Sequence, residues 1–124
     1  MEDPKSVLQR EFAQLGEEIQ KLAITRQTLS LQLNENEGVR EEFALLSEGA
    51  VIYREIGPAL VKADTADAKA LVDGRVDMIS KDLKKIESLV EEKGKRRLDV
   101  QAQFQKLVQE EEEQKAKTQA AGLT

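Results

Sequence analysis

Residues 50–62 read AVIYREIGPALVK and differ in composition from the sequence on either side. The first half is rich in β-branched and aromatic residues, and the Gly-Pro pair at 57–58 is a typical turn signal. On an extended strand Ile52 and Ile56 share one face, while Tyr53 lies on the opposite face. The segment therefore predicts a β-hairpin of two short strands.

Such a hairpin needs a partner surface. Two strands alone are marginally stable in water, and both edges of the hairpin present unpaired backbone groups. Two surfaces could cover the apolar side chains: hairpins from other chains, or the helices of the same chain. Slender helices cover little of a hairpin, which favours assembly with other chains. The residues predicted to build that assembly are Val51, Ile52, Tyr53, Leu60 and Val61.

The residues before the hairpin predict a long helix from about 6 to 46. Either Ser6 or the Asp-Pro pair at 3–4 can begin it, since Pro is favoured at the first helical position. The side chains at its start are spaced 4-3-4-3, which is a coiled-coil seam: Leu8, Phe12, Leu15, Ile19 and Leu22. Asn36 falls on this seam, either as a polar contact that fixes the register or as the point where the helices diverge.

The residues after the hairpin predict a second helix over 65–109, with Asp64 or Thr65 as its cap. Its seam alternates steps of three and four without a slip and runs through Val72, Val76, Ile79, Leu83, Ile86, Val90, Lys93, Arg97, Val100, Phe104 and Leu107. The two helices should therefore pack antiparallel as a coiled coil. On that register Phe12 faces Phe104, Ile19 faces Arg97, and the two cations interrupt the apolar seam.

Composition excludes several classes of protein. The 124 residues carry a net charge of −5, with 35% charged and only 3% aromatic residues, which favours long helices over a globular core. Because the chain has no Cys and no His, we expect no catalytic residues, no metal site and no cofactor. No stretch approaches the ~18 apolar residues of a membrane span, and the acidic start is unlike a secretory signal. We therefore expect a cytoplasmic protein with no membrane partner and no enzymatic activity.

Charged runs near the C-terminus carry little functional information. Residues 93–97 resemble a basic nucleic-acid patch, but they are flanked by acidic residues and lack aromatic residues for stacking, so we expect no nucleic-acid partner. The four glutamates at 110–113 point around a helix, not toward one centre. Residues 115–124 are small and polar and predict a disordered tail.

The free ends of the two helices are the candidate binding region. Their apolar residues are either ordinary seam packing or an apolar grip at the tip of a long arm, and the sequence leaves both interpretations open. The residues concerned are Val7, Leu8, Phe12, Phe104, Leu107 and Val108.

Several motifs resemble the β-type prefoldin subunits, with the most detailed match to eukaryotic subunit six. Residues 32–36 (QLNEN), 41–43 (EEF) and 51–53 (VIY) are similar to that family's first helix and first strand. Residues 56–62 (IGPALVK) resemble its hairpin, and the resemblance covers about residues 7–109.

The resemblance implies a single domain over 1–124 whose hairpin joins an intersubunit β-barrel. It implies a heterohexamer of α-type and β-type prefoldin subunits that captures unfolded actin and tubulin at its coiled-coil tips and delivers them to the cytosolic chaperonin. By position, the hairpin residues named above would build the platform and the tip residues would contact the client. The alternative is a coiled-coil scaffold or spacer that binds no client.

Overall fold

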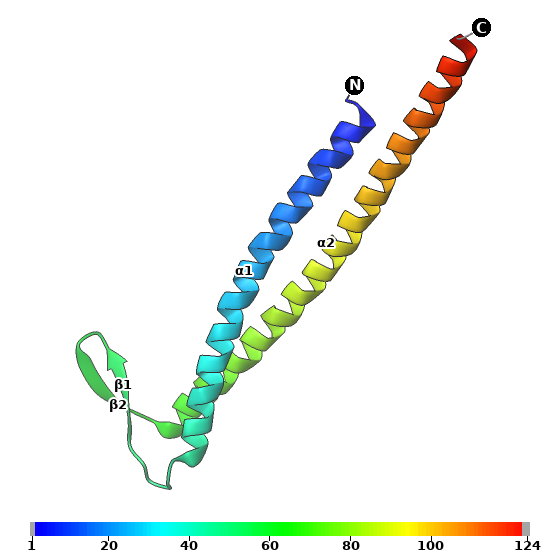
Figure 1. The fold of residues 1–124 in the computed structure, drawn as a ribbon. Coiled ribbons are helices and arrows are strands. Elements are labelled where there is room, and N and C mark those ends of the chain that lie inside the picture. Colours follow the sequence, from blue (N-terminus) through cyan, green and yellow to red (C-terminus); the bar gives the residue numbers. More distant parts are fainter. Residues whose placement is uncertain (1, 123–124) are drawn as a thin grey trace. The chain divides into compact units, whose positions relative to one another are not determined.

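The structure is a computed structural model and describes residues 2–122. It consists of helix α1 (Pro4–Leu45), strand β1 (Ile52–Ile56), strand β2 (Ala59–Ala63) and helix α2 (Thr65–Gly122), in that order (Figure 1). The predicted fold class is confirmed: two long helices are joined by an antiparallel β-hairpin.

The described chain divides into two compact units. The hairpin unit comprises residues 25–87, and the terminal unit comprises residues 2–24 together with 88–122. Both helices contribute to each unit, and each unit is described below by itself. None of the helices within residues 2–122 combines the length and apolar character that a membrane crossing requires.

Aspartates begin both helices. The Asp3 carboxylate accepts a hydrogen bond from the Lys5 amide at 3.2 Å, and Pro4 takes the first helical position. The Asp64 carboxylate accepts one from the Asp67 amide at 3.0 Å. These contacts satisfy amides that a helix start leaves unpaired. Of the alternatives that the sequence offered, Asp3-Pro4 and Asp64 are therefore the caps.

Two glycines with positive φ shape the connection to the hairpin and its turn. Gly49 has φ +85° in a tight turn closed by the Ala50 amide on the Ser47 carbonyl at 3.0 Å, which matches a type II turn. Gly57 has φ +60° at the first position of a two-residue loop, as a type II′ hairpin turn requires. A residue with a side chain is strained at either position.

The hairpin register places the apolar residues mainly on one face. Ile52 pairs with Ala63, Arg54 with Val61, and Ile56 with Ala59, and opposed residues share a face. The other face carries Tyr53 opposite Lys62 and Glu55 opposite Leu60. Val51, which the sequence placed on the first strand, lies just before β1.

Each unit has a small apolar core along the predicted seam. Val72 and Val76 are buried in the hairpin unit, and Leu15 and Val100 in the terminal unit. Asn36 does not reach a partner helix: its amide donates to the Gln32 carbonyl one turn back on α1, at 2.7 Å. Of the two interpretations of Asn36, the structure therefore does not support a register-fixing contact between helices.

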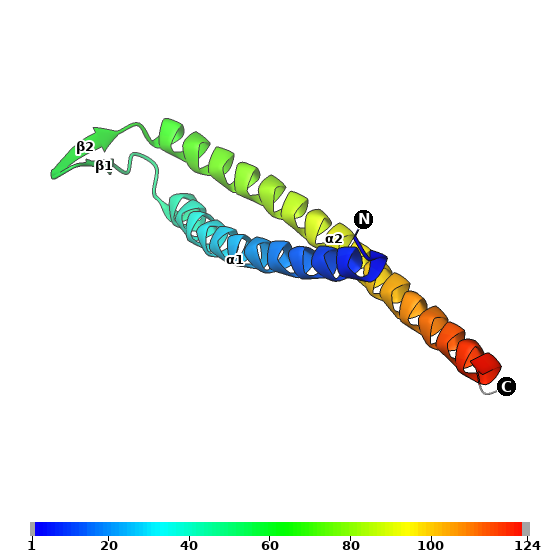
Figure 2. The ribbon, with the colours of Figure 1, turned by 90° about the horizontal axis from the view of Figure 1, so that it is seen from above.

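The C-terminal segment differs from the prediction. Helix α2 continues to Gly122 and passes the start of α1 in the terminal unit (Figure 2), so the expected disorder is wrong for residues 115–122. Residues 123–124 of the predicted tail lie outside the described residues. Ala, Lys and Gln are strong helix formers, and Glu111 and Glu113 each precede a lysine by four positions, a spacing that supports an exposed helix. Local propensity extends the helix where no seam is present.

Candidate functional site

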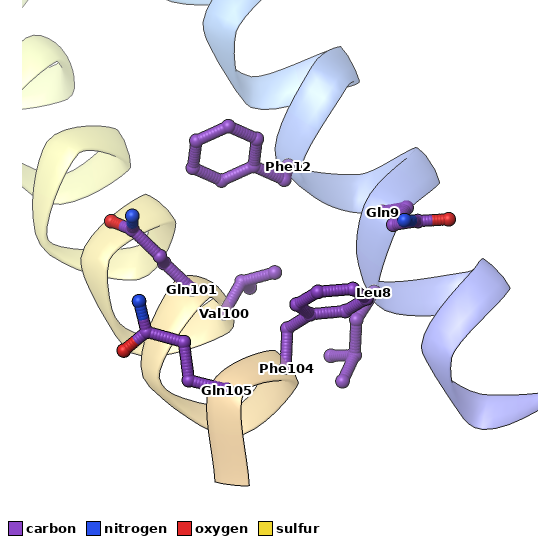
Figure 3. A pocket seen from close by; sticks show the side chains of 7 residues that line it. All are labelled: Leu8, Gln9, Phe12, Val100, Gln101, Phe104 and Gln105. Carbon is purple, nitrogen blue, oxygen red and sulfur yellow. The ribbon is translucent and has the colours of Figure 1, made fainter. Parts of the chain in front are cut away.

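An open groove lies between the two helices in the terminal unit. It has a volume of about 360 Å³, and its wall residues are Leu8, Gln9 and Phe12 from α1 with Val100, Gln101, Phe104 and Gln105 from α2. Figure 3 shows the apolar side chains of both helices around the hollow, with the three glutamine amides beside them. We call it the terminal groove. It can receive an apolar side chain and offer hydrogen bonds at its rim.

The groove contains half of the predicted tip residues. Leu8, Phe12 and Phe104 are half-buried and line it, whereas Val7, Leu107 and Val108 are not among its lining residues. Val7 is 45% exposed, and the other two are half-buried. Val100, a seam residue not predicted at the tip, is fully buried and forms the base of the groove.

Ion pairs connect the two helices beside the groove. Lys5 pairs with Glu111, and Lys93 Nζ lies 2.8 Å from Glu18. Arg96 holds Glu11 through two hydrogen bonds of 2.7 and 3.1 Å, and also pairs with Asp99 on its own helix. These contacts are partly exposed, so each stabilises the unit only slightly. Their sequence positions rise on α1 as they fall on α2, which establishes the antiparallel direction in this unit.

The Glu18–Lys93 pair predicts a pH dependence. The hydrogen bond from Lys93 holds the pKa of the Glu18 carboxyl below its ordinary value. Since the folded pKa is the lower one, the stabilisation is present above the unfolded pKa and is lost as pH falls through the folded pKa. We expect thermal melting of the wild type and of Glu18→Gln to converge as the pH is lowered through and then below the ordinary glutamate range.

Glu17→Gln is the matched control for that measurement. Glu17 pairs with Lys21 on its own helix, so this variant removes the same charge without removing the cross-helix pair of Glu18 and Lys93. A Glu18→Gln difference that stays constant across acidic pH would contradict the assigned role of the pair.

The side chain of Arg97 reaches across to α1 and contacts Phe12. Its guanidinium carbon lies 3.9 Å from the centre of the Phe12 ring, and its Nε donates to the Phe12 carbonyl at 3.3 Å. A Cβ built at Gly16 would lie 2.6 Å from the Nη2 atom of Arg97. The cation therefore occupies space that exists because residue 16 has no side chain.

The predicted assembly residues remain uncovered in the hairpin unit. Exposed fractions are 52% for Val51, 62% for Tyr53, 69% for Leu60 and 46% for Val61, while Ile52 is half-buried. The helices of the same chain therefore leave most of this apolar surface open, and the alternative of burial against them is not what the structure shows.

A hollow of about 650 Å³ lies beside this surface, within the hairpin unit. Ile52 and Val61 line it from the hairpin, Phe43 from the end of α1, and Leu71 and Arg75 from the start of α2. Leu71 is itself 45% exposed. The hollow extends the apolar hairpin face onto the adjoining helix ends.

Sequence reasoning missed several of these residues. The glutamines of the terminal groove have no distinguishing pattern, and the role of Phe43 depends on the position of the hairpin. Arg97 and Gly16 did leave a signal, because a cation on an apolar seam and a glycine inside a long helix each contradict local expectation. Only the structure shows that the end of the Arg97 side chain lies against Gly16.

Comparison with known proteins identifies relatives along most of the chain. A family model described as prefoldin subunit matches residues 6–120. Prefoldin subunit 6 from Bos taurus is 35% identical over 108 residues, covering 85% of this chain and 84% of that protein. Prefoldin subunit 6 from Saccharomyces cerevisiae is 32% identical over 88 residues, covering 71% and 77%.

A solved structure shares the fold. The prefoldin beta subunit from Thermococcus strain KS-1 superposes with a TM-score of 0.76 at 19% sequence identity, covering 83% of this chain and 90% of that one. At this identity the likeness concerns the fold alone, and it includes the hairpin between two helices. Since the family model spans nearly the whole described chain, this protein belongs to the prefoldin subunit family.

Proposed function

We propose that this chain is one subunit of an ATP-independent co-chaperone in the cytoplasm. In this proposal it forms a single functional domain and assembles with α-type and β-type prefoldin subunits into a heterohexamer. The assembly captures non-native proteins of the actin and tubulin class and delivers them to the cytosolic chaperonin. The chain itself catalyses no reaction.

The exposed hairpin is the observation that carries the assembly proposal. Tyr53, Leu60 and Val61 are large apolar residues with about half or more of their surface exposed, on a hairpin that has two open edges. Strands from neighbouring chains would cover the apolar residues and pair the edges at once. Joined hairpins forming a β-barrel satisfy both needs without leaving a free edge.

The terminal groove supports client capture. Its apolar walls suit the side chains that a non-native protein exposes, and the amides of Gln9, Gln101 and Gln105 can bond peptide groups of any sequence. One such contact is weak. When several coiled coils of an assembly bind the same client, each contact raises the effective concentration of that client at the other tips. Weak individual contacts also allow release without an energy source. We assign client contact to Val7, Leu8, Phe12, Phe104, Leu107 and Val108.

Native mass spectrometry of the chain, purified gently with its partners, tests the assembly. We expect a complex of six chains that contains several different prefoldin subunits. A homodimer or a monomer would contradict the proposal and favour the scaffold alternative. Suppression of aggregation of unfolded actin by that complex, followed by transfer to chaperonin, then tests capture and delivery separately.

A further inference from the structure

We propose that Arg97 is a positioning residue that holds the Phe12 ring as a wall of the terminal groove, and that Gly16 is glycine in order to admit it. The inference rests on the proposed function, because the groove is where the client would bind. It assigns a role to two residues that neither the seam nor the ion pairs explain.

Arg97 is held by α1 in two ways. Its guanidinium stacks on the Phe12 ring at 3.9 Å, within the range of a cation–π contact. Its Nε also donates to the Phe12 carbonyl at 3.3 Å, using the acceptor capacity that remains beside the helix bond. Both contacts are made to the same residue. The side chain therefore grips the ring and the backbone of Phe12 together.

Gly16 makes this approach possible. The Nη2 atom of Arg97 lies where a side chain at residue 16 would begin, 2.6 Å from an added Cβ. The obstructed atom is the far end of a flexible side chain, so a methyl group at residue 16 displaces Arg97 and leaves the helices in place. Glycine is otherwise a poor choice inside a helix.

Phe12 is the link between this contact and the groove. It lines the groove with Leu8 and Phe104, while its ring is covered by Arg97. Without the guanidinium, the ring is free to rotate about its side-chain bonds and to fill the hollow. An apolar residue at position 97 would stabilise the coiled-coil seam more than arginine does. In this proposal Arg97 instead maintains the shape of the groove, and the coiled coil is less stable as a result.

The test compares Gly16→Ala with Gly94→Ala in the full chain, each assembled with its partner subunits. An added Cβ at Gly94 meets nothing within 4 Å, so this control has the same change in helix propensity in the same unit. The chain is labelled with fluorophenylalanine, and its three phenylalanines give three ¹⁹F signals. Assembly and aggregation of a denatured client are measured on the same samples.

We expect Gly16→Ala to assemble with at least wild-type helix content, to shift the Phe12 signal, and to bind client roughly threefold or more weakly. Gly94→Ala should match the wild type in both readouts. Unchanged client binding in Gly16→Ala, or an unmoved Phe12 signal, overturns the inference. A purely structural role predicts the opposite, since alanine strengthens the helix.

A second variant keeps the test decisive if Gly16→Ala does not assemble. Arg97→Leu fills the seam, so we expect equal or higher thermal stability together with weaker client binding. Wild-type client binding by Arg97→Leu overturns the inference. A wild-type complex that binds no client would instead refute the proposed function, which separates the two failures.

Discussion

Replacing Val61 by aspartate should prevent the chain from entering a multi-chain complex while leaving its helix content unchanged. Val61 lies on β2 opposite Arg54, on the face that also carries Ile52 and Ile56, and it is 46% exposed in the isolated chain. Burying a carboxylate in an apolar intersubunit contact costs several kcal/mol even with Arg54 opposite, because the charge loses its water, and this weakens assembly by about a hundredfold or more. The seams of the two helices are untouched, so circular dichroism should remain helical.

Two variants control for this result. Val61→Thr keeps the β-branched shape without the charge, and we expect it to assemble more weakly than the wild type but still detectably. Leu98→Asp introduces the same charge on α2, where the leucine is already 68% exposed, and should assemble normally. Full assembly of Val61→Asp, measured by native mass spectrometry, would remove the case for hairpin-mediated contact.

Removing the terminal groove should leave assembly intact and reduce client protection by roughly tenfold. The variant lacks residues 1–11 and 101–124, and therefore loses Leu8 and Phe104 from the groove walls. The hairpin unit, residues 25–87, is complete in this variant. Suppression of client aggregation, at equal concentrations of assembled complex, is the measurement.

A shorter truncation separates the groove from the exposed end of α2. Deletion of residues 112–124 removes only exposed polar turns among the described residues and keeps Glu111, the partner of Lys5. We expect client protection to remain at the wild-type level. If the long truncation protects clients as well as the short one does, the terminal groove is not the binding site.

Local pattern was sufficient to predict the elements of the fold. The steps of three and four residues predicted both helices, and the Gly-Pro pair at 57–58 predicted the turn, because these signals act within a few residues of chain. The last turns of α2 were missed for a related reason. The seam ends near Leu107 and predicts the end of the helix close to that residue, although the helix propensity of residues 115–122 is enough to continue it.

The candidate site was less predictable, because it depends on which residues of one helix lie opposite each residue of the other. The apolar side chains of Leu8, Phe12 and Phe104 could be found on the seam. The contact of Arg97 with Phe12 could not, since heptads specify which positions form the stripe but not where the end of a long side chain on that stripe lies. The contribution of Gln9, Gln101 and Gln105 likewise requires the groove itself.

The two-residue turn at Gly57 has a consequence for how this hairpin can evolve. Side chains alternate between faces along a strand, so the length of the turn determines which of them point to each side. Inserting or deleting a single residue there would exchange the two faces along a whole strand. Point substitutions within β1 and β2 can alter the chemistry of the surface gradually, one residue at a time. A change in the length of the turn cannot be gradual. Substitutions on the two strands are therefore easier to accept during evolution than an insertion or deletion in the turn.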